Sequence, residues 1–290
     1  MRNYILLFIF FLCISPFGRL GAQEPLTFDV GDFQVSVLPE GGQNAKADIL
    51  KGATSEALRK YLPDGTFPLQ IQVFLVRTPG RILLVDAGYG TNLSKNLKSL
   101  GVSEKDIHVI LLTHMHGDHI GGLLRDGKKV FPNADLYLSK AEFDYWTGEK
   151  ERGADARKVL DAYKNMLHIF VPAELGKTTT DLFPGIQPIA AYGHTPGHTA
   201  FLLESNKTRL LLWGDVAHAM PIQMPRPEVA LSFDSNPAQA IQTRKSILEY
   251  VSKNKIRVVG VHIPFPAIGD IAPSTEEGYE FIPTCACEGY

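Results

Sequence analysis

Four mostly apolar runs of this sequence each lead into a histidine or an aspartate. Residues 109–113, 185–191, 209–213 and 257–261 have the short apolar pattern of buried strands. The side chains that follow them are His114, His194, Asp215 and His262. Residues at strand ends lie in loops at one edge of a rigid scaffold, where functional side chains gather. The pattern therefore predicts a layered α/β fold that brings these four side chains together.

Strands and helices alternate along the rest of the chain. Further strands are predicted at 33–38, 69–77, 81–86, 134–138 and 199–204. A turn at 78–80 joins the second and third of these strands, and a turn at 206–207 joins the last one to the strand at 209–213. Helices are predicted at 91–100, around residues 143–146 and at 154–167. Another helix begins with Asn236 as its cap and Pro237 at its first position. Because both halves mix strands and helices, we expect an αββα sandwich, with two packed mixed β-sheets flanked by helices.

The first 22 residues are predicted to be a signal peptide and not part of the fold. Arg2 supplies a positive charge, and Tyr4 to Ile14 form an unbroken apolar stretch of 11 residues before the small pair Gly21-Ala22. A bilayer crossing needs about 20 apolar residues, so this stretch fits a cleaved signal peptide better than an uncleaved anchor. We therefore expect a periplasmic or secreted protein whose mature part, residues 23–290, is one domain without a stable membrane span.

The composition favours a small-molecule partner. The 290 residues carry a formal net charge of −2, and the sequence pI is about 6.5. This balance gives no support for binding nucleic acid or an acidic membrane surface. Cys285 and Cys287 are separated by one residue, which makes a disulfide between them strained, so this pair stays unassigned.

The segment His114-Met-His116-Gly-Asp118-His119 carries a dense set of metal-binding groups. In an extended loop His114 and His116 can both reach one ion, and after a tight turn at Gly117 the pair Asp118 and His119 can reach a second. Neutral imidazole and carboxylate are ligands that zinc and similar divalent ions prefer. Three histidines and an aspartate within six residues are hard to satisfy in another way, because buried polar groups need partners. The segment therefore predicts a metal centre.

This segment, followed by a distant histidine, an aspartate and a last histidine, resembles the metallo-β-lactamase superfamily. The likeness extends to the branch of methyl parathion hydrolase and related lactonases through Asp181–Ile186, Val261–Pro266 and Gly278–Pro283. The resemblance implies that one metal is held by His114, His116 and His194. It implies that the other is held by Asp118, His119 and His262, with Asp215 bridging the two. It also implies supporting residues that orient the ligands, namely Asp86 and His198.

The resemblance further implies a hydrolase with two divalent metal ions, for which zinc is expected. Two such ions share a bridging hydroxide that attacks a carbonyl carbon or a phosphorus atom. Asp118 is then the candidate for moving a proton to the leaving group, while Asp215 bridges the ions. The expected substrate is a small ester, lactone or phosphotriester. Candidate walls of an apolar pocket are Phe143, Trp146 and Phe265, with helix core as the alternative role of these rings.

Two alternatives share much of the motif. A mononuclear iron enzyme of the persulfide dioxygenase type would be an oxidoreductase. A β-lactamase is disfavoured, because the zinc-dependent types lack the bridging aspartate that Asp215 would supply, and no cysteine lies between His119 and His262. The identity of the metal and the oligomeric state stay open, a homodimer included. Outside the motif, surface or packing roles are expected for His108 and His168. His218 lies three residues after Asp215, where it could line the pocket, but a packing role is expected for it.

Overall fold

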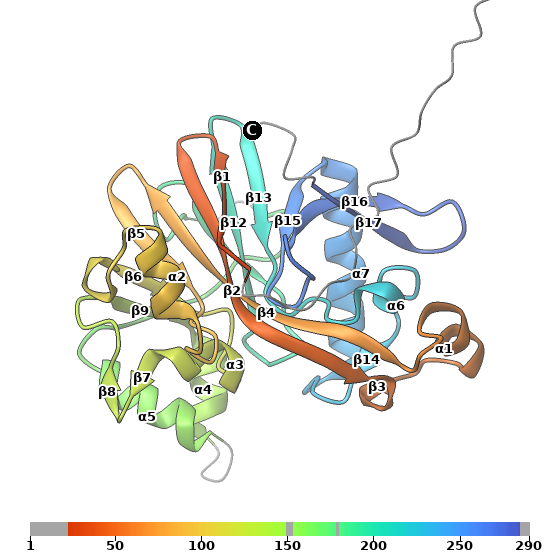
Figure 1. The fold of residues 1–290 in the computed structure, drawn as a ribbon, viewed down its shortest axis with the longest axis horizontal. Coiled ribbons are helices and arrows are strands. Elements are labelled where there is room, and N and C mark those ends of the chain that lie inside the picture. Colours follow the sequence, from red (N-terminus) through yellow and green to blue (C-terminus); the bar gives the residue numbers. More distant parts are fainter. Residues whose placement is uncertain (1–22, 149–152, 178–179, 285–290) are drawn as a thin grey trace, which may run out of the picture.

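Two β-sheets pack face to face, and helices cover their outer sides (Figure 1). The computed structural model describes residues 23–148, 153–177 and 180–284. The expected signal peptide, residues 1–22, lies outside these residues, as do Cys285 and Cys287. Within the described residues the predicted αββα architecture is confirmed.

The first sheet has seven strands in the described part of the chain, in the order β1-β2-β4-β5-β6-β9-β10. Neighbours up to β5 pair antiparallel, and the strands from β5 to β10 pair in parallel. On β5, Leu83 and Val85 face the second sheet, whereas Leu84 faces the helices. A sheet buried on both faces needs apolar residues at successive positions. The strands are β1 (Leu26–Val30), β2 (Phe33–Lys46), β4 (Thr66–Thr78), β5 (Arg81–Val85), β6 (Val109–Leu111), β9 (Asp135–Ser139) and β10 (Leu167–Phe170).

The second sheet has the order β11-β12-β13-β15-β16-β17. Only β13 and β15 pair in parallel among its described strands. The predicted turn between β12 and β13 is present, with φ values of 48° and 66° at Asn206 and Lys207, as a two-residue hairpin turn requires. The strands are β11 (Ile186–Ala190), β12 (Thr199–Ser205), β13 (Thr208–Leu212), β15 (Arg257–Val259), β16 (Ile268–Pro273) and β17 (Tyr279–Pro283).

The helices largely follow the predicted segments. The side chain of Asn236 accepts a hydrogen bond from the Gln239 N–H and so caps the longest described helix, α7. The helix predicted at 154–167 is too long, because it ends at Tyr163 and Leu167 already begins β10. The helices are α1 (Ser55–Tyr61), α2 (Leu93–Ser99), α3 (Gly117–Ile120), α4 (Lys140–Gly148), α5 (Ala154–Tyr163), α6 (Met220–Gln223) and α7 (Pro237–Asn254).

Short elements complete the described chain. Two small ladders pair β3 (Leu50–Lys51) with β14 (Ala230–Leu231), and β7 (Leu124–Arg125) with β8 (Lys128–Lys129). Three 3₁₀ turns lie at η1 (Ala47–Ile49), η2 (Glu104–Asp106) and η3 (Gly121–Leu123).

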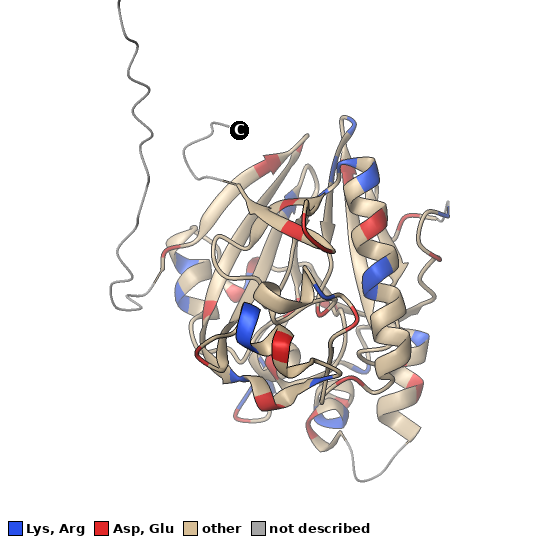
Figure 2. Ribbon diagram, turned by 90° about the vertical axis from the view of Figure 1, so that its right-hand side faces the viewer, with Lys and Arg blue, Asp and Glu red and all other residues tan. Residues whose placement is uncertain are grey.

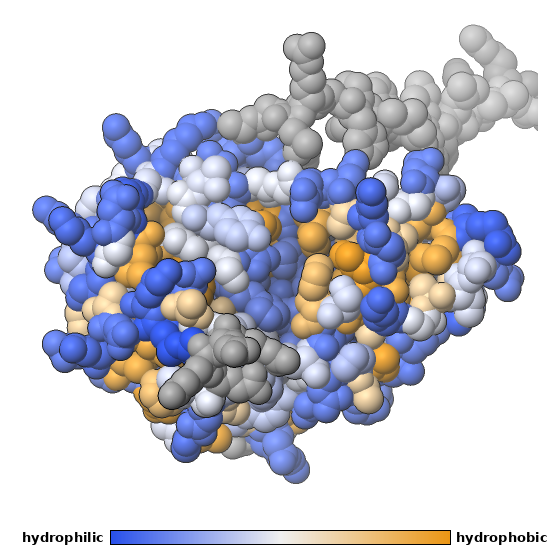
Figure 3. Space-filling model, turned by 90° about the horizontal axis from the view of Figure 1, so that it is seen from below, coloured by the Kyte–Doolittle hydropathy of each residue, from blue (hydrophilic) through white to orange (hydrophobic). Residues whose placement is uncertain are grey.

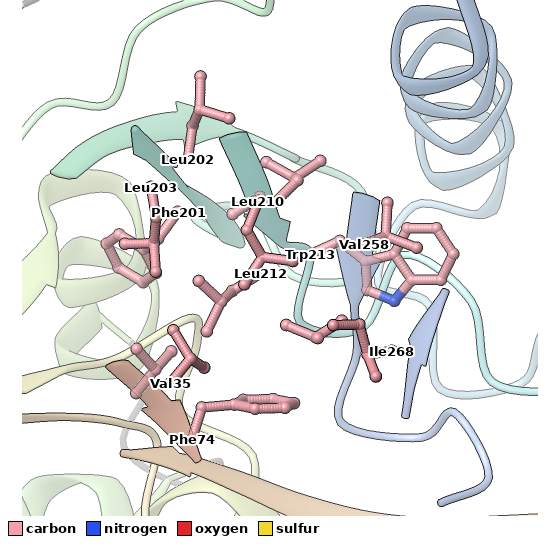
Figure 4. Close-up of a cluster of buried hydrophobic side chains, with 14 of the residues drawn as sticks. Val35, Phe74, Phe201, Leu202, Leu203, Leu210, Leu212, Trp213, Val258 and Ile268 are labelled. Atoms are coloured by element: carbon pink, nitrogen blue, oxygen red, sulfur yellow. The ribbon is translucent and has the colours of Figure 1, made fainter. Parts of the chain in front are cut away.

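The space between the sheets is filled by apolar side chains from both of them (Figure 4). Val35 and Phe74 of the first sheet meet Phe201 and Leu212 of the second in one buried cluster. Burying a Val, Leu or Phe side chain contributes about 1.5–3 kcal/mol each. A second buried cluster lies on the other face of the first sheet, under α2 and α5. These cores fix the strands, and thereby the loops that follow them.

Strands β2 and β4 continue beyond the first sheet as a two-stranded arm, residues 39–69 (Figure 1, lower right). Their register shifts between Pro39 and Gly41, where the arm begins. The arm carries α1 and β3 and has its own small core, in which Leu62 and Phe67 pack with Ile222 and Leu231 of the second half. The arm therefore reaches across the strand ends of both sheets.

Acidic and basic residues are interspersed along the ribbon (Figure 2), in keeping with the net charge of −2. None of the helices in the described part of the chain is both long and apolar enough for a membrane crossing.

Candidate metal centre

Side chains from both sheets converge in the loops that follow the strands. One group consists of His114, His116, His194 and Asp215, whose possible ligand atoms all lie within 4.8 Å of one another. Nδ1 of His116 lies 2.9 Å from Nε2 of His114 and 3.0 Å from Nε2 of His194. A tetrahedral zinc ion with ligand nitrogens at about 2.0–2.1 Å holds them roughly 3.3 Å apart. The group therefore has the spacing of one metal position.

A second group consists of Asp118, His119 and His262. Oδ1 of Asp118 lies 3.8 Å from Nε2 of His119, and Oδ2 of Asp118 lies 3.5 Å from Nε2 of His262. Asp215 of the first group also contacts the second, because its Oδ1 is 3.2 Å from Nε2 of His119 while its Oδ2 is 3.1 Å from Nε2 of His194. One carboxylate thus contacts both groups, which is the arrangement that a bridging ligand needs.

The backbone before Asp215 is shaped by a glycine and a histidine. Gly214 has a φ of 59°, and a Cβ there would lie only 2.5 Å from Nε2 of His198, so a glycine is required. His198 accepts a hydrogen bond from the Asp215 N–H at 2.9 Å and donates through Nδ1 to the Ala191 carbonyl at 2.8 Å. Both ring nitrogens of His198 are therefore engaged by backbone groups, one of them that of Asp215, so this ring can orient Asp215 without itself being a ligand.

In each group, one histidine is hydrogen-bonded to a carboxylate through Nδ1, the ring nitrogen that faces away from the other ligand atoms. Nδ1 of His119 lies 2.7 Å from Oδ2 of Asp86, and Nδ1 of His194 lies 2.9 Å from Oδ1 of Asp234. Such partners fix the tautomer and the ring orientation of a ligand histidine. Asp86 was expected from the sequence. Asp234 was not, because an aspartate two residues before a helix cap looks like an ordinary turn residue.

Burial and the neighbouring carboxylates act on the histidines in opposite directions. Burial, with the neighbouring charges, lowers the pKa of His116 to about 3 and the pKa of His114 well below its usual range. Both rings are therefore neutral, and a neutral ring offers a lone pair to a cation. Burial also acts to lower the pKa of His119. The negative charges of the surrounding carboxylates, of which Asp215 has the largest effect, nevertheless raise this pKa well above its usual range. Although burial acts to raise the pKa of Asp215, the surrounding histidines hold it well below its ordinary value.

Two buried atoms at the centre of the cluster have no hydrogen-bond partner. They are Nε2 of His119 and Oδ1 of Asp215, which lie 3.2 Å apart. Leaving a buried polar atom unpaired costs about 1–3 kcal/mol. A divalent cation would satisfy both atoms, and the donor set of imidazoles and carboxylates suits zinc-like ions. The residues present therefore fit two metal positions.

A cavity of about 340 Å³ opens beside the two groups. Its polar part includes Asp118 and His218, and its apolar part includes Leu69 of the arm. Two aromatic rings at the mouth, Tyr89 and Phe233, are 59% and 49% exposed. Seen from below, the surface has a hydrophilic hollow with hydrophobic residues on either side (Figure 3). This volume and lining suit a small molecule with a polar reacting group and an apolar part.

The residues that line this cavity do not include the expected aromatics Phe143, Trp146 and Phe265, although the ring of Trp146 lies 5.8 Å from the ring of His116, which does line it. Phe143 and Trp146 on α4 pack against the core on the outer face of the first sheet, because a helix on a sheet must bury its apolar face. Phe265 packs against the core between the sheets. His218, for which a packing role was expected, is buried but also lines the cavity, and its Nε2 lies 2.9 Å from Oδ2 of Asp215.

The chain matches a known protein family over most of its length. Residues 66–262 match the metallo-beta-lactamase superfamily. Over 159 residues the chain is 25% identical to an N-acyl homoserine lactonase of Bacillus cereus, a match that covers 55% of this chain and 57% of that protein. The chain therefore spans little more than half the length of this curated relative.

Two solved structures are similar over almost the whole chain. One is the hydrolase AbOPH of the beta lactamase superfamily, with a TM-score of 0.79, 28% identity, and coverage of 90% of this chain and 98% of that one. The other is AidC, a dizinc quorum-quenching lactonase in complex with a product, with a TM-score of 0.80, 27% identity, and coverage of 91% and 98%. Together with the family match over residues 66–262, these similarities show that the chain belongs to the metallo-β-lactamase superfamily.

Proposed function

We propose that this chain is a dinuclear metal-dependent hydrolase that opens a small lactone or ester carrying an apolar acyl group. The observation that carries the proposal is the position of Asp215, which lies within 3.2 Å of both His119 and His194 and so contacts both ligand groups. The similarity to the Bacillus cereus N-acyl homoserine lactonase and to AidC supports a lactone as substrate. Phosphotriesters are the second substrate class compatible with such a centre.

When bound, two divalent ions would polarise the carbonyl oxygen of the substrate and make a water molecule nucleophilic near neutral pH. Asp118 lines the cavity, and its side chain is 21% exposed, so it can accept the proton that the attacking water gives up. The water oxygen bonds to the carbonyl carbon, and the ring C–O bond breaks. Asp118 then gives the proton to the leaving alkoxide, so that one water and one lactone yield one hydroxy acid.

The rest of the substrate is held by the cavity mouth. Leu69, Tyr89 and Phe233 offer apolar surface beside the polar ligand groups, and an acyl chain would cover part of this surface. Covering apolar surface contributes about 25 cal/mol per Å². The carbonyl end then lies at the ligand groups and the acyl end at the aromatic rings.

The test is a metal analysis combined with a substrate panel. We expect about two divalent ions per chain, as in other two-metal sites, and ring opening of acyl-homoserine lactones in preference to phosphotriesters and β-lactams. Asp215→Ala and His119→Ala should abolish cleavage. His168→Ala is the matched control, since His168 lies exposed on β10, outside both groups, and it should leave cleavage unchanged.

Three outcomes would count against the proposal. Cleavage that persists in a metal-free preparation would exclude a metal-dependent hydrolase. One iron per chain together with oxygen uptake would favour the oxidoreductase alternative. Hydrolysis of β-lactams alone would favour a β-lactamase.

We also propose that residues 1–22 direct export and are removed before Gln23. The positive start at Arg2, the apolar stretch from Tyr4 to Ile14 and the small pair Gly21-Ala22 support this proposal. Amino-terminal sequencing of protein recovered outside the cytoplasm should begin at Gln23, and an intact first residue would contradict the proposal.

A further inference from the structure

Glu142 is a fully buried carboxylate that lies between two of the ligand-bearing loops. It is in the first turn of α4, and its residue exposure is 0%. It is not a member of either ligand group. A buried carboxylate is costly unless donors surround it, so its partners indicate its role.

Four donors surround the two oxygens of Glu142. Oε1 accepts from the Met115 N–H at 3.0 Å and from the indole N–H of Trp146. Oε2 accepts from the Thr195 hydroxyl at 2.6 Å and from the Gly197 N–H at 3.0 Å. Each oxygen therefore holds a different loop through hydrogen bonds.

The two loops are those of the first ligand group. Met115 stands between His114 and His116, and Thr195 directly follows His194. Nδ1 of His116 lies 2.9 Å from a ring nitrogen of His114 and 3.0 Å from a ring nitrogen of His194. His116 and His194 are 78 residues apart in the chain. One carboxylate thus connects the backbones that carry all three rings.

The contact between the second loop and α4 is tight. A Cβ at Gly197 would lie 2.1 Å from the backbone nitrogen of Glu142, so only glycine allows this approach. The Ser139 hydroxyl also donates to the Gly197 carbonyl at 2.7 Å. The loop therefore lies directly against the backbone of α4, which places the Glu142 carboxylate within hydrogen-bond distance of Thr195 and Gly197.

We propose that Glu142 is a positioning residue that sets the spacing of the His114–His116 loop and the His194 loop, and thereby the metal affinity of the first ligand group. This inference rests on the proposed function, because it assumes that the group binds a metal. Glu142 acts through hydrogen bonds to the loops and contacts no ligand atom. Its effect should therefore fall on one of the two metal positions.

The test is Glu142→Gln, followed by titration of the purified metal-free protein with Co²⁺ and then with a competing chelator. An amide accepts at only one oxygen, and its NH₂ group would face the N–H donors of one loop. We expect the affinity of the first group to fall about 10-fold, the lower end of the effect of losing a group that hydrogen-bonds to a metal ligand, because Glu142 acts on the ligands through the loops that carry them. The second group should keep its affinity. The visible bands of the two positions are assigned by their loss in His194→Ala and in His262→Ala.

Glu40→Gln is the matched control. Glu40 is also buried, at 4% exposure, and it accepts hydrogen bonds from the Thr91 and Asn92 N–H groups at 2.8 and 2.9 Å, but it holds neither ligand loop. The Glu40→Gln variant should bind metal at both positions with unchanged affinity. If Glu142→Gln does not fold, Thr195→Val takes its place, since it removes one of the four donors and should weaken the first group alone.

The outcomes separate the two proposals. A wild-type chain that binds no divalent ions would overturn the proposed function. A wild-type chain that binds two ions, with a Glu142→Gln variant that binds both equally well, would overturn only the role of Glu142. An equal loss at both positions would also overturn it, because that result would indicate general loosening of the fold. If Glu142→Gln is unfolded, an unchanged metal affinity of the first group in Thr195→Val would overturn the role of Glu142.

Discussion

Asp234 orients His194, and its replacement by asparagine should weaken one metal position. Oδ1 of Asp234 lies 2.9 Å from Nδ1 of His194, and Oδ2 accepts from the Leu231 N–H at 2.9 Å. Both residues are buried, Asp234 at 7% and His194 at 3% exposure. Solvent therefore cannot replace the lost charge.

The size of the effect follows from these two hydrogen bonds. Asparagine can still accept from Nδ1 of His194, but the bond loses its charge, which lowers its contribution from about 1.5–3 to about 1 kcal/mol. Its NH₂ group then faces the Leu231 N–H, so both of these buried donors lack an acceptor, at a further cost to folding. A loss of about 1.4 kcal/mol in binding is a tenfold change. We therefore expect about tenfold weaker metal binding at the His114–His116–His194 group in Asp234→Asn.

Isothermal titration of the metal-free protein with Zn²⁺ measures this change. Asp86→Asn is the counterpart for the second group, because Asp86 holds Nδ1 of His119 at 2.7 Å. Asp234→Asn should weaken the first position and spare the second. Asp86→Asn should weaken the second position most, with a smaller effect on the first, because the Thr113 hydroxyl lies 2.8 Å from Asp86 and 3.1 Å from Nδ1 of His114. Unchanged zinc affinity in Asp234→Asn, or equal weakening of both positions, would refute the reasoning.

Three further changes test the core, a turn and the cavity. Leu212→Ala removes a side chain that is 1% exposed and lies between the sheets. Urea denaturation should show a free energy of unfolding that is lower by about 2–5 kcal/mol. A smaller loss would mean that neighbouring side chains move to fill the space. Gly193→Ala should lower the melting temperature, because φ is 128° and the new Cβ would lie 2.2 Å from the Ala240 backbone nitrogen; an unchanged melting temperature would contradict this geometry. Phe233→Ala should raise KM for long-chain lactones with little change in kcat, since it removes binding that is equal in the ground state and the transition state; a fall in kcat alone would place the ring at the reacting centre.

The strand-end pattern allowed most of the fold to be predicted. The runs that lead into His114, His194, Asp215 and His262 are strands β6, β11, β13 and β15 or their immediate extensions. Most residues of these strands are buried, so their runs are mostly apolar and easily recognised. The loops after them meet because both sheets present the ends of these strands on the same side.

The arm could not be predicted in the same way. Residues 39–46 of β2 are polar and glycine-rich, and several of them are exposed, so they lack the alternation of a half-buried strand. The pairing of this segment with β4 and its small core with Ile222 are tertiary effects. Leu69 of the arm lines the cavity, so part of the substrate wall was also beyond prediction.

The aromatic residues expected at the pocket differ from those that line the cavity for a related reason. Phe143 and Trp146 have helical spacing, which describes equally well a helix that buries its rings and one that offers them to a ligand. Tyr89 and Phe233, which do line the cavity, stand singly in loops. A single aromatic residue in a loop gives no periodic signal, and only the fold brings the two rings to the same opening.

The ligand groups have a consequence for the lifetime of the protein. Each group takes residues from the segment that follows β6 in the first sheet, which includes α3, and from loops of the second sheet. A bound ion would therefore tie the two halves of the sandwich together, and unfolding would have to release it. At a free metal concentration 100 times the dissociation constant, this linkage adds about 2.7 kcal/mol for each position. Resistance to proteases would then depend on the supply of metal in the surroundings, and chains made under metal starvation would be degraded first.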